Sequence, residues 1–236
     1  MAPDLLRASG IDAGYGRVQA LWGAGLSLRA GESVVLLGAN GAGKTTLLKV
    51  LLGLLPAWRG SVSLAGADIT GLRTDRRVRQ GMAYMSELGV FTGLSIDENI
   101  RIGGQFSDQA TLRRRVEELY AIFPDLAHRR RALAGSLSGG QRKMAGIAKA
   151  LAGSPRLLVM DEPSAGLSPL FVAEVLAVLA RFRAEGLSLL VAELNVTFLE
   201  LADRVFTLEG GRIGFEGTVE ALHADDALNR AYFGLA

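Results

Sequence analysis

The chain has 236 residues, of which 49% are hydrophobic and 21% charged, a composition of one large folded domain or two closely packed ones and not of a disordered or fibrous chain. Its 26 Lys and Arg nearly balance 24 Asp and Glu, so the net charge of +2 gives little support to nucleic-acid binding. The absence of cysteine excludes a disulfide framework, a zinc–thiolate site and a cysteine nucleophile, and two histidines argue against a histidine-rich metal site.

Neither the beginning of the chain nor its most apolar stretch has the features of a membrane-targeting segment. Residues 1–7 lack the cationic stretch and apolar core of a secretory signal, so we expect a cytosolic protein. Residues 47–58 are interrupted by Lys49, Gly53 and Pro56, and they fall short of the roughly 20 residues that cross a bilayer. The positive mean hydropathy therefore indicates a sheet buried on both faces, or a docking surface.

The first clear structural signal along the chain is an apolar run followed by glycines and then by a helix-forming segment. Residues 33–37 read Ser-Val-Val-Leu-Leu and predict a strand, and residues 46–52 predict a helix. Residues 156–160 and 187–192 are further apolar runs of strand length. Strands that are apolar throughout and alternate with helices are typical of a parallel sheet covered on both faces, so we expect an α/β fold.

Between about residues 88 and 134 the character of the sequence changes, and we expect a helical insert in the α/β core. Residues 111–123 predict an arginine-rich helix with one apolar face, and a basic run follows at residues 128–131. For these arginines a solvated surface is favoured over contact with nucleic acid or lipid.

The C-terminal third continues the alternation of helix and strand. Ser168 is a candidate N-cap for a helix that Gly186 ends. Residues 205–215 contain two apolar runs around Glu-Gly-Gly and predict a hairpin. An amphipathic segment follows at residues 219–233.

Residues 38–45, Gly-Ala-Asn-Gly-Ala-Gly-Lys-Thr, fit the phosphate-loop pattern and lie between the predicted strand and helix. The glycines let backbone N–H groups turn toward phosphate oxygens, and the helix N-terminus adds its positive dipole. We expect Lys44 to bridge the β- and γ-phosphates and Thr45 to ligate Mg²⁺. A chance glycine-rich turn is the alternative, which the flanking elements disfavour.

The strand predicted near residue 157 ends abruptly in two carboxylates, Asp161 and Glu162. Acids rarely occur in buried strands unless they have a partner. At the carboxyl edge of a parallel sheet they lie beside the phosphate loop, so Asp161 is expected to orient Mg²⁺ and Glu162 to activate a water. The alternative is two acids that merely close a strand.

A third motif, Leu-Ser-Gly-Gly-Gln at residues 137–141, precedes a helix predicted from Arg142 to Leu151. Ser138 is a candidate cap, and the glycines can present backbone donors to a second anion. An ordinary capped turn explains the same residues equally well. By itself the motif leaves open why one chain would carry two phosphate sites.

Together, in this order and spacing, the three motifs resemble those of the nucleotide-binding subunits of ATP-binding cassette transporters, and the resemblance covers residues 6–233. The resemblance implies a P-loop nucleoside triphosphatase core, an N-terminal antiparallel β subdomain and a helical insert. These form a single domain, 1–236, with a core at 1–87 and 152–236 and an insert at 88–151. It also implies a head-to-tail dimer, in which the phosphate loop of one chain and the Leu-Ser-Gly-Gly-Gln of the other hold the same ATP.

The resemblance assigns roles to individual residues. Tyr15 matches an aromatic that stacks on adenine, although core packing is the other interpretation of a lone tyrosine. The implied catalytic residues are Glu162 and Lys44, and the implied Mg²⁺ ligands are Thr45, Glu87 and Asp161. The implied ATP- and Mg²⁺-binding residues are Tyr15, Gly38, Asn40, Gly41, Ala42, Gly43, Lys44, Thr45, Thr46, Glu87, Ser138, Gly139, Gly140, Gln141, Asp161 and Asn195.

Three positions depart from the usual family pattern. Ser168 replaces an Asp in the loop after Glu162, and Glu87 replaces a Gln that reaches Mg²⁺ and touches the membrane subunit; a carboxylate can still ligate Mg²⁺. Residues 193–195 replace a His that contacts the γ-phosphate, and losing one such donor is expected to cost about 2.7–4 kcal/mol. Asn195 is expected to compensate in part as a neutral donor.

Glu87 and the Glu-x-Asn at residues 193–195 resemble the branch of the family that serves branched-chain and related hydrophobic amino acids. Residues 15–21, 38–44, 162–169 and 231–234 are similar to the same branch. The resemblance implies ATP hydrolysis coupled to solute import at the cytoplasmic face of the membrane. The implied partners are a second copy or a homologous subunit, two transmembrane permease subunits and, indirectly, a solute-binding protein. Urea or amide import and a catalytically weak dimerisation switch remain alternatives. A role on DNA or ribosomes is disfavoured.

Docking to the membrane subunits is expected near residues 87–93. Val90, Phe91 and Leu94 supply apolar side chains of the kind found at interface hot spots. Ordinary packing within the insert is an equally good explanation of the same residues.

Overall fold

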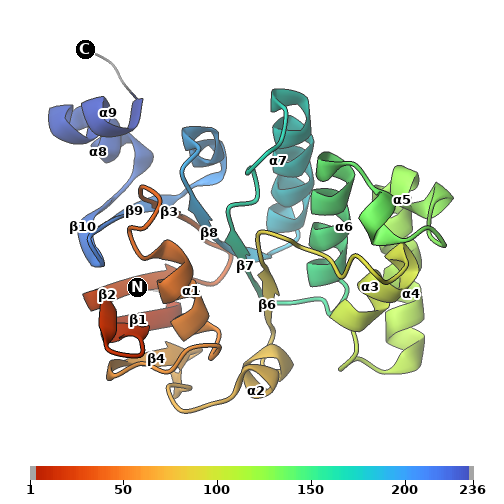
Figure 1. Cartoon of the computed structure of the whole chain (residues 1–236), viewed down its shortest axis with the longest axis horizontal. Coiled ribbons are helices and arrows are strands. Elements are labelled where there is room, and N and C mark those ends of the chain that lie inside the picture. The colour runs from red at the N-terminus through yellow and green to blue at the C-terminus, as the bar shows by residue number, and fades with distance from the viewer. Residues whose placement is uncertain (1–3, 234–236) are drawn as a thin grey trace.

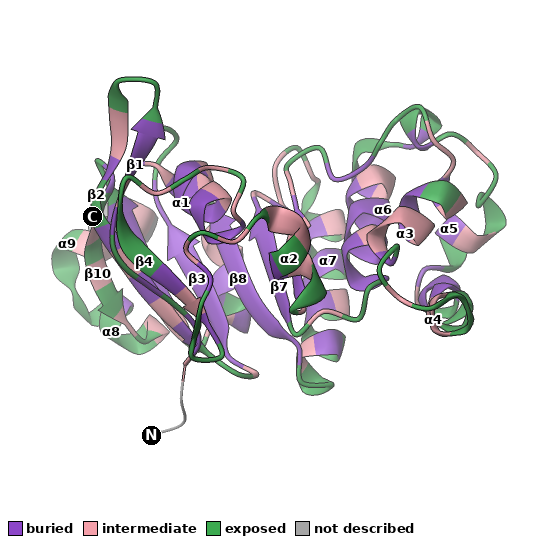
Figure 2. Ribbon diagram, turned by 90° about the horizontal axis from the view of Figure 1, so that it is seen from below, coloured by how far each residue is buried: buried purple, intermediate pink, exposed green. Residues whose placement is uncertain are grey.

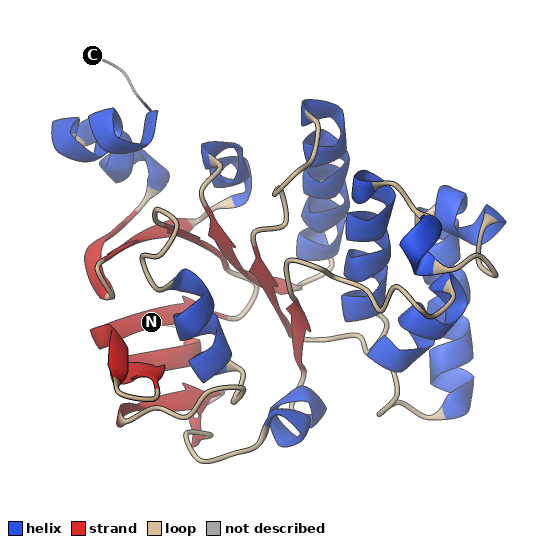
Figure 3. Cartoon of the chain, viewed as in Figure 1, coloured by secondary structure: helices blue, strands red, loops and turns tan. Residues whose placement is uncertain are grey.

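The computed structural model describes residues 4–233 and contains two sheets (Figures 1 and 3). Both ends of the predicted domain 1–236, including Gly234 of the closing sequence, lie outside the described residues. The smaller sheet is antiparallel with strand order β2-β1-β4-β5, which confirms the expected β subdomain. Its strands are β1 (Asp4–Tyr15), β2 (Val18–Arg29), β4 (Arg59–Leu64) and β5 (Ala67–Asp68).

The larger sheet has the order β10-β9-β3-β8-β7-β6. Its five strands from β9 to β6 pair in parallel, and only β10 is antiparallel, through the predicted hairpin. Its strands are β3 (Ser33–Leu37), β6 (Met82–Met85), β7 (Leu157–Asp161), β8 (Ser188–Glu193), β9 (Arg204–Glu209) and β10 (Arg212–Gly217).

Helices cover both faces of the larger sheet, and α3, α4 and α5 lie beyond its β6 edge (Figure 1). Among the described residues no helix is both long and apolar enough to cross a bilayer. The α-helices are α1 (Lys44–Leu51), α2 (Thr74–Arg79), α3 (Ile96–Gly103), α4 (Gln109–Ile122), α5 (Pro124–His128), α6 (Gly139–Leu151), α7 (Pro169–Ala184), α8 (Val219–Ala224) and α9 (Asp226–Phe233), and the 3₁₀ helices are Ala134–Ser136 and Val196–Leu201.

Alternation along the parallel strands sends side chains into two separate cores. In β3, Val34 and Leu36 pack with α1 and the antiparallel sheet, whereas Val35 and Leu37 pack with α6 and α7. The strands are accordingly buried on both faces (Figure 2). The same alternation decides on which face each polar residue at a strand end lies.

Several predicted helix boundaries were wrong by a few residues, each for a local reason. The helix expected from Arg142 begins at Gly139, because Ser138 caps it directly. The segment 219–233 is two helices, because extended Asp225 ends α8 and its carboxylate accepts the first N–H groups of α9. Ser168 precedes α7 as expected, but its side chain makes no capping hydrogen bond.

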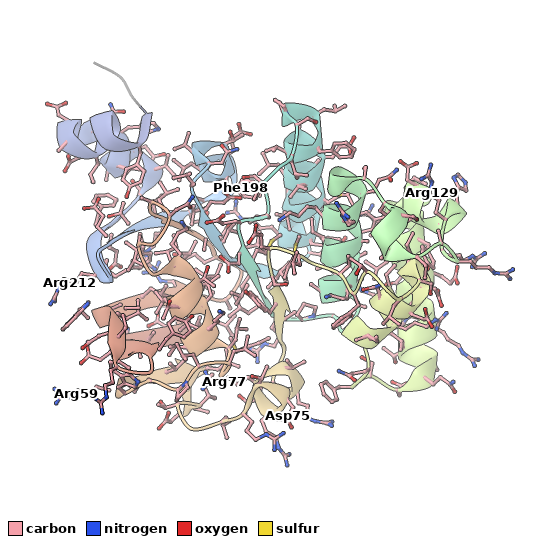
Figure 4. The ribbon with its side chains drawn as sticks, in the orientation of Figure 1. Arg59, Asp75, Arg77, Arg129, Phe198 and Arg212 are labelled. Atoms are coloured by element: carbon pink, nitrogen blue, oxygen red, sulfur yellow. The ribbon has the colours of Figure 1, made fainter. Side chains whose placement is uncertain are left out.

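A buried arginine fastens the C-terminal end of α1 to the segment before α2. Arg77 is 2% exposed and donates hydrogen bonds to the carbonyls of Val50, Leu51, Leu72 and Thr70 at 2.7–2.9 Å (Figure 4). A cation at a helix C-terminus also interacts favourably with the helix dipole. Arg129, by contrast, points away from the molecule (Figure 4), in line with the solvated basic run expected there.

Candidate functional site

The loop between β3 and α1 has the conformation that the phosphate-loop pattern predicts. Gly41 and Gly43 have φ values of 81° and 108°, in the left-handed region that favours glycine. A Cβ at Gly38 would lie 2.5 Å from the carbonyl oxygen of Leu208, so this position requires glycine too. The first N–H groups of α1 have no partner inside the helix, and Asn40 and Gly41 are exposed. The loop therefore presents backbone donors to an anion.

Lys44 is folded back over this loop. It is 4% exposed, and its Nζ donates to the carbonyls of Gly38 at 2.6 Å and Ala39 at 3.3 Å. The same Nζ lies 3.3 Å from Oε1 of Glu162. The predicted phosphate-binding lysine and the predicted catalytic carboxylate are thus in direct contact.

Asp161 ends β7 on the face that packs against α1, because Val159, two residues earlier, belongs to that core. Its carboxylate accepts hydrogen bonds from Thr45 Oγ1 at 3.1 Å and from Tyr84 Oη at 3.3 Å. Burial raises the pKa of Asp161 despite these two donors, and burial beside this carboxylate also raises the pKa of Tyr84. A hydroxyl and a desolvated carboxylate are oxygen ligands that suit Mg²⁺. Thr45 and Asp161 therefore fit the expected metal.

Glu162 continues from β7 with a left-handed backbone, φ 47°, which is unusual for a non-glycine residue. Its N–H donates to the carbonyl of Ala192, and its own carbonyl accepts from Lys143 Nζ at 2.9 Å. These contacts turn the chain so that the Glu162 side chain reaches Lys44. The sequence offered no signal for the contact with Lys143.

The remaining predicted residues of the loop lie around this centre in different environments. Tyr15 is 48% exposed at the end of β1. Nζ of Lys49 in α1 lies 3.3 Å from its hydroxyl and 5.5 Å from the centre of its ring, so a half-exposed aromatic side chain lies beside α1. Thr46 is buried in the first turn of α1. Ala42 is also buried, and its carbonyl accepts the N–H of Gly211.

The Leu-Ser-Gly-Gly-Gln motif lies on the other face of the larger sheet. Ser138 and Gln141 form a reciprocal capping box at the start of α6, and Ser138 and Gly139 are exposed. Gly140 is buried against α7, where a Cβ would meet the ring of Phe171 at 2.5 Å. Since α1 and α6 belong to different cores and lie on opposite sides of β8 and β7 (Figure 1), the motif does not join the phosphate loop of its own chain.

Glu87 and Asn195, from two of the three departures from the family pattern, lie in loops beside these elements. Glu87 is exposed just after β6, and its carbonyl accepts from Lys143 Nζ at 2.8 Å. In the part of the chain that the structure describes, no group of three Asp, Glu or His side chains is placed to hold a metal ion. The role of Glu87 as a Mg²⁺ ligand therefore stays a prediction. Asn195 Oδ1 accepts the N–H of Thr197 and caps a 3₁₀ helix, which leaves its amide nitrogen as the donor.

One further buried acid was missed at the sequence level. Glu193, 1% exposed at the end of β8, accepts the N–H groups of Ser164, Leu194 and Asn195 at 2.7–3.2 Å. It joins the loop after Glu162 to the loop after β8. An acid at the end of a buried strand, the signal used for Asp161, could have found it.

Comparison with known proteins identifies the family. The family model described as "ABC transporter" matches residues 21–165, more than half of the chain. The chain belongs to the ATP-binding cassette transporter family. It is an ATP-binding subunit of a family that hydrolyses ATP, which confirms the resemblance, the fold class and the ATPase prediction. Subunits of this family dimerise and work with membrane permeases.

Individual relatives of this cassette cover nearly its whole length. It is 37% identical to the high-affinity branched-chain amino acid transport ATP-binding protein BraG of Pseudomonas aeruginosa, over 93% of this chain and 95% of the relative. It is 32% identical to the lipopolysaccharide export system ATP-binding protein LptB of Escherichia coli, over 89% of this chain and 88% of the relative. A solved structure of a nucleotide-free ATP-binding cassette from an ABC transporter superposes on this chain with a TM-score of 0.86 at 25% identity. The match covers 98% of this chain and 99% of that one.

Proposed function

We propose that this cassette is the ATP-hydrolysing subunit of an importer for branched-chain or other hydrophobic amino acids, peripheral to the cytoplasmic face of the membrane. The carrying observation is the contact of Lys44 with Glu162 beside the pair Thr45–Asp161, which groups a phosphate-binding cation, a metal-binding pair and a carboxylate at one loop. The solute assignment is supported by the similarity to BraG and, at 32% identity, to a probable LivF of Archaeoglobus fulgidus. The likeness to LptB, whose name specifies lipopolysaccharide export, marks the alternative that transport assays must test.

In this proposal each residue of the site has one task. The phosphate loop, Gly38 to Thr46, holds the phosphates, and Lys44 exchanges its own loop carbonyls for the β- and γ-phosphates. Thr45 and Asp161, with Glu87 as a third ligand, would hold Mg²⁺, which would supply positive charge to offset that of the phosphates. Glu162 orients a water in line with the γ-phosphate and accepts its proton. Tyr15 stacks on the adenine.

The second half of the site comes from another chain, either a second copy or a homologous subunit. The exposed Ser138 and Gly139 lie at the start of α6, on the opposite side of the larger sheet from their own phosphate loop. A head-to-tail pair brings them to the γ-phosphate of the partner's ATP. The insert, 88–151, would carry them as part of the single domain 1–236.

Two exposed apolar residues beside Glu87 form the proposed docking surface for the two permease subunits. Leu88 is 82% exposed and Phe91 54%, whereas Val90 is packed in the core. Packing within the insert therefore accounts for Val90. Leu88, which the sequence analysis did not select, replaces Val90 as a proposed contact residue. The solute-binding protein acts through the permeases, without contact with this chain.

Glu162→Gln tests the role on which this mechanism depends. The variant is expected to bind ATP and to release phosphate at least about a hundredfold more slowly, as losses of a general base commonly do. Phosphate release at the wild-type rate would remove Glu162 from its proposed role. Uptake of labelled leucine and of urea, in vesicles containing the permeases and the binding protein, then tests the solute.

A second candidate is an ATP-dependent dimerisation switch paired with an active homologous subunit. It is favoured by the region after β8, where Glu193 is buried and Asn195 caps a helix in place of a histidine. Phosphate release should be measured for this chain alone and mixed with the homologous subunit. Activity found only in the mixture and retained with Glu162→Gln would support the switch.

A further inference from the structure

Lys143 is a buried cation that the proposed chemistry does not use. It lies in α6 two residues after Gln141 and is 7% exposed. Among residues 4–233, no carboxylate lies close enough to the Lys143 ammonium to form an ion pair with it. Its Nζ instead donates to two backbone carbonyls, that of Glu87 at 2.8 Å and that of Glu162 at 2.9 Å.

Holding an ammonium in this position is costly, which indicates that it serves a purpose beyond packing. Burial lowers the pKa of Lys143, and the acids around it, Glu87, Glu193, Glu162 and Asp161, oppose that change. An apolar side chain of similar length would fill the same space without the desolvation cost. What such a side chain could not do is join two separate loops.

The carbonyls that Lys143 joins belong to Glu162, the proposed general base, and to Glu87, the predicted Mg²⁺ ligand beside the proposed docking surface. Glu162 has a left-handed backbone whose N–H is held by Ala192 and whose carbonyl is held by Lys143. Strained backbone persists only where the surroundings fix it on both sides. The Glu87 segment is held close to the same helix, since a Cβ on Gly146 would lie 3.0 Å from Gly89 Cα.

We propose that Lys143 is a positioning residue, which fixes the backbone of Glu162 and the Glu87 segment to α6 and so couples both to the start of that helix. The inference rests on the proposed role of Glu162. Because Ser138 to Gln141 begin the same helix, a shift of α6 on pairing with the partner chain pulls on both carbonyls. Hydrolysis at Glu162 and the proposed docking surface beside Glu87 then respond together to dimer closure.

The test compares Lys143→Met, which removes every donor, with Lys143→Arg, which keeps them. Steady-state ATP hydrolysis by the full chain should show kcat for Lys143→Met lowered about tenfold to a hundredfold, the range that small misplacements cause. KM should change by less than about threefold, since Lys143 contacts no substrate. Lys143→Arg should restore most of kcat, which a purely structural role would not predict.

Lys149→Met is the matched control in the same helix. Burial also lowers the pKa of Lys149, but its ammonium lies 4.8 Å from the ring of Phe91 and away from both carbonyls. Its kcat should stay within about twofold of wild type. An equal fall in kcat for Lys149→Met and Lys143→Met would overturn the inference in favour of general destabilisation.

Amide hydrogen exchange provides a second measurement that does not depend on activity. In Lys143→Met, or in Lys143→Gln if the methionine variant does not fold, exchange should accelerate in residues 86–91 and 162–167 only. Unchanged exchange in both segments overturns the inference. Failure of the underlying mechanism gives a different result: Glu162→Gln would hydrolyse ATP at the wild-type rate, whatever Lys143 does.

Discussion

The ammonium of Lys44 lies 3.3 Å from the carboxylate of Glu162, and it also donates to the carbonyls of Gly38 and Ala39. Contacts within the chain therefore already hold the proposed phosphate-binding cation in place. One group of this pair attracts the γ-phosphate and the other repels it. Substitutions of Lys44 and of Glu162 should accordingly change ATP affinity in opposite directions.

The first prediction follows from this opposition. Lys44→Met should weaken ATP binding at least about tenfold, because a charged hydrogen bond contributes about 1.5–3 kcal/mol. Glu162→Gln should bind ATP at least as tightly as wild type, because a negative charge is removed near the phosphates. Titration with a fluorescent ATP analogue measures both affinities. Equal weakening in the two variants would contradict the arrangement.

Asp161 illustrates a conflict between function and stability. Its raised pKa means that the folded chain binds this proton more tightly than the unfolded chain. The free energy of unfolding therefore falls as pH rises from the ordinary aspartate value toward the raised one. Asp161→Asn, which cannot ionise, should raise Tm at pH 7 without nucleotide, by about 2–4 °C for each kcal/mol gained. The same variant should require far more Mg²⁺ for hydrolysis.

The control for Asp161→Asn is Asp125→Asn, an exposed acid on α5. It should leave the Mg²⁺ requirement unaltered and change stability by less than about 0.5 kcal/mol. Thermal melts from pH 4 to 8 should show the gain in Asp161→Asn shrinking toward acid pH. A gain in Tm that is constant across that range would contradict an ionisation effect.

Two adjacent glycines of the Leu-Ser-Gly-Gly-Gln motif should respond differently to alanine. A Cβ on Gly140 meets the ring of Phe171 at 2.5 Å, whereas the nearest atom to a Cβ on Gly139 is 3.9 Å away. Gly140→Ala should therefore destabilise the chain by about 1–3 kcal/mol through overpacking, and Gly139→Ala should not. Chemical denaturation measures both. Adding Phe171→Leu should recover part of the loss in Gly140→Ala.

Much of the site could be predicted from sequence because its parts are local. The phosphate loop, the acids ending β7 and the capped turn at Ser138 each occupy a few consecutive residues whose chemistry is legible without tertiary structure. The contacts of Lys143 with two distant carbonyls and of Glu193 with the Ser164 loop depend on how α6, β7 and β8 pack. Helix starts were misjudged where capping, rather than hydrophobic periodicity, sets the first residue.

Arg77 should contribute strongly to stability although it lies outside the site. Arg77→Ala removes the arginine donor from four carbonyls. That of Val50 keeps the N–H of Gly53 at 3.1 Å, whereas those of Leu51, Thr70 and Leu72 lose their partner, and buried acceptors without partners cost about 1–3 kcal/mol. We expect a loss of about 3 kcal/mol in the free energy of unfolding. The exposed neighbour Arg76→Ala should change it by less than about 0.5 kcal/mol. Urea denaturation of both variants distinguishes a specific anchor from a general loss of charge.

Phe91 should determine assembly without affecting hydrolysis by the isolated chain. Its ring is 54% exposed beside Leu88, and a charge there disfavours burial against a permease. Phe91→Glu should reduce co-purification with the permeases at least about tenfold, the loss expected when a hot-spot contact of about 1.4 kcal/mol or more is removed. Phe106→Glu is the matched control, since Phe106 is 38% exposed and lies against Arg79, away from this surface. Intact assembly with Phe91→Glu, or equal loss in both variants, would place the docking surface elsewhere.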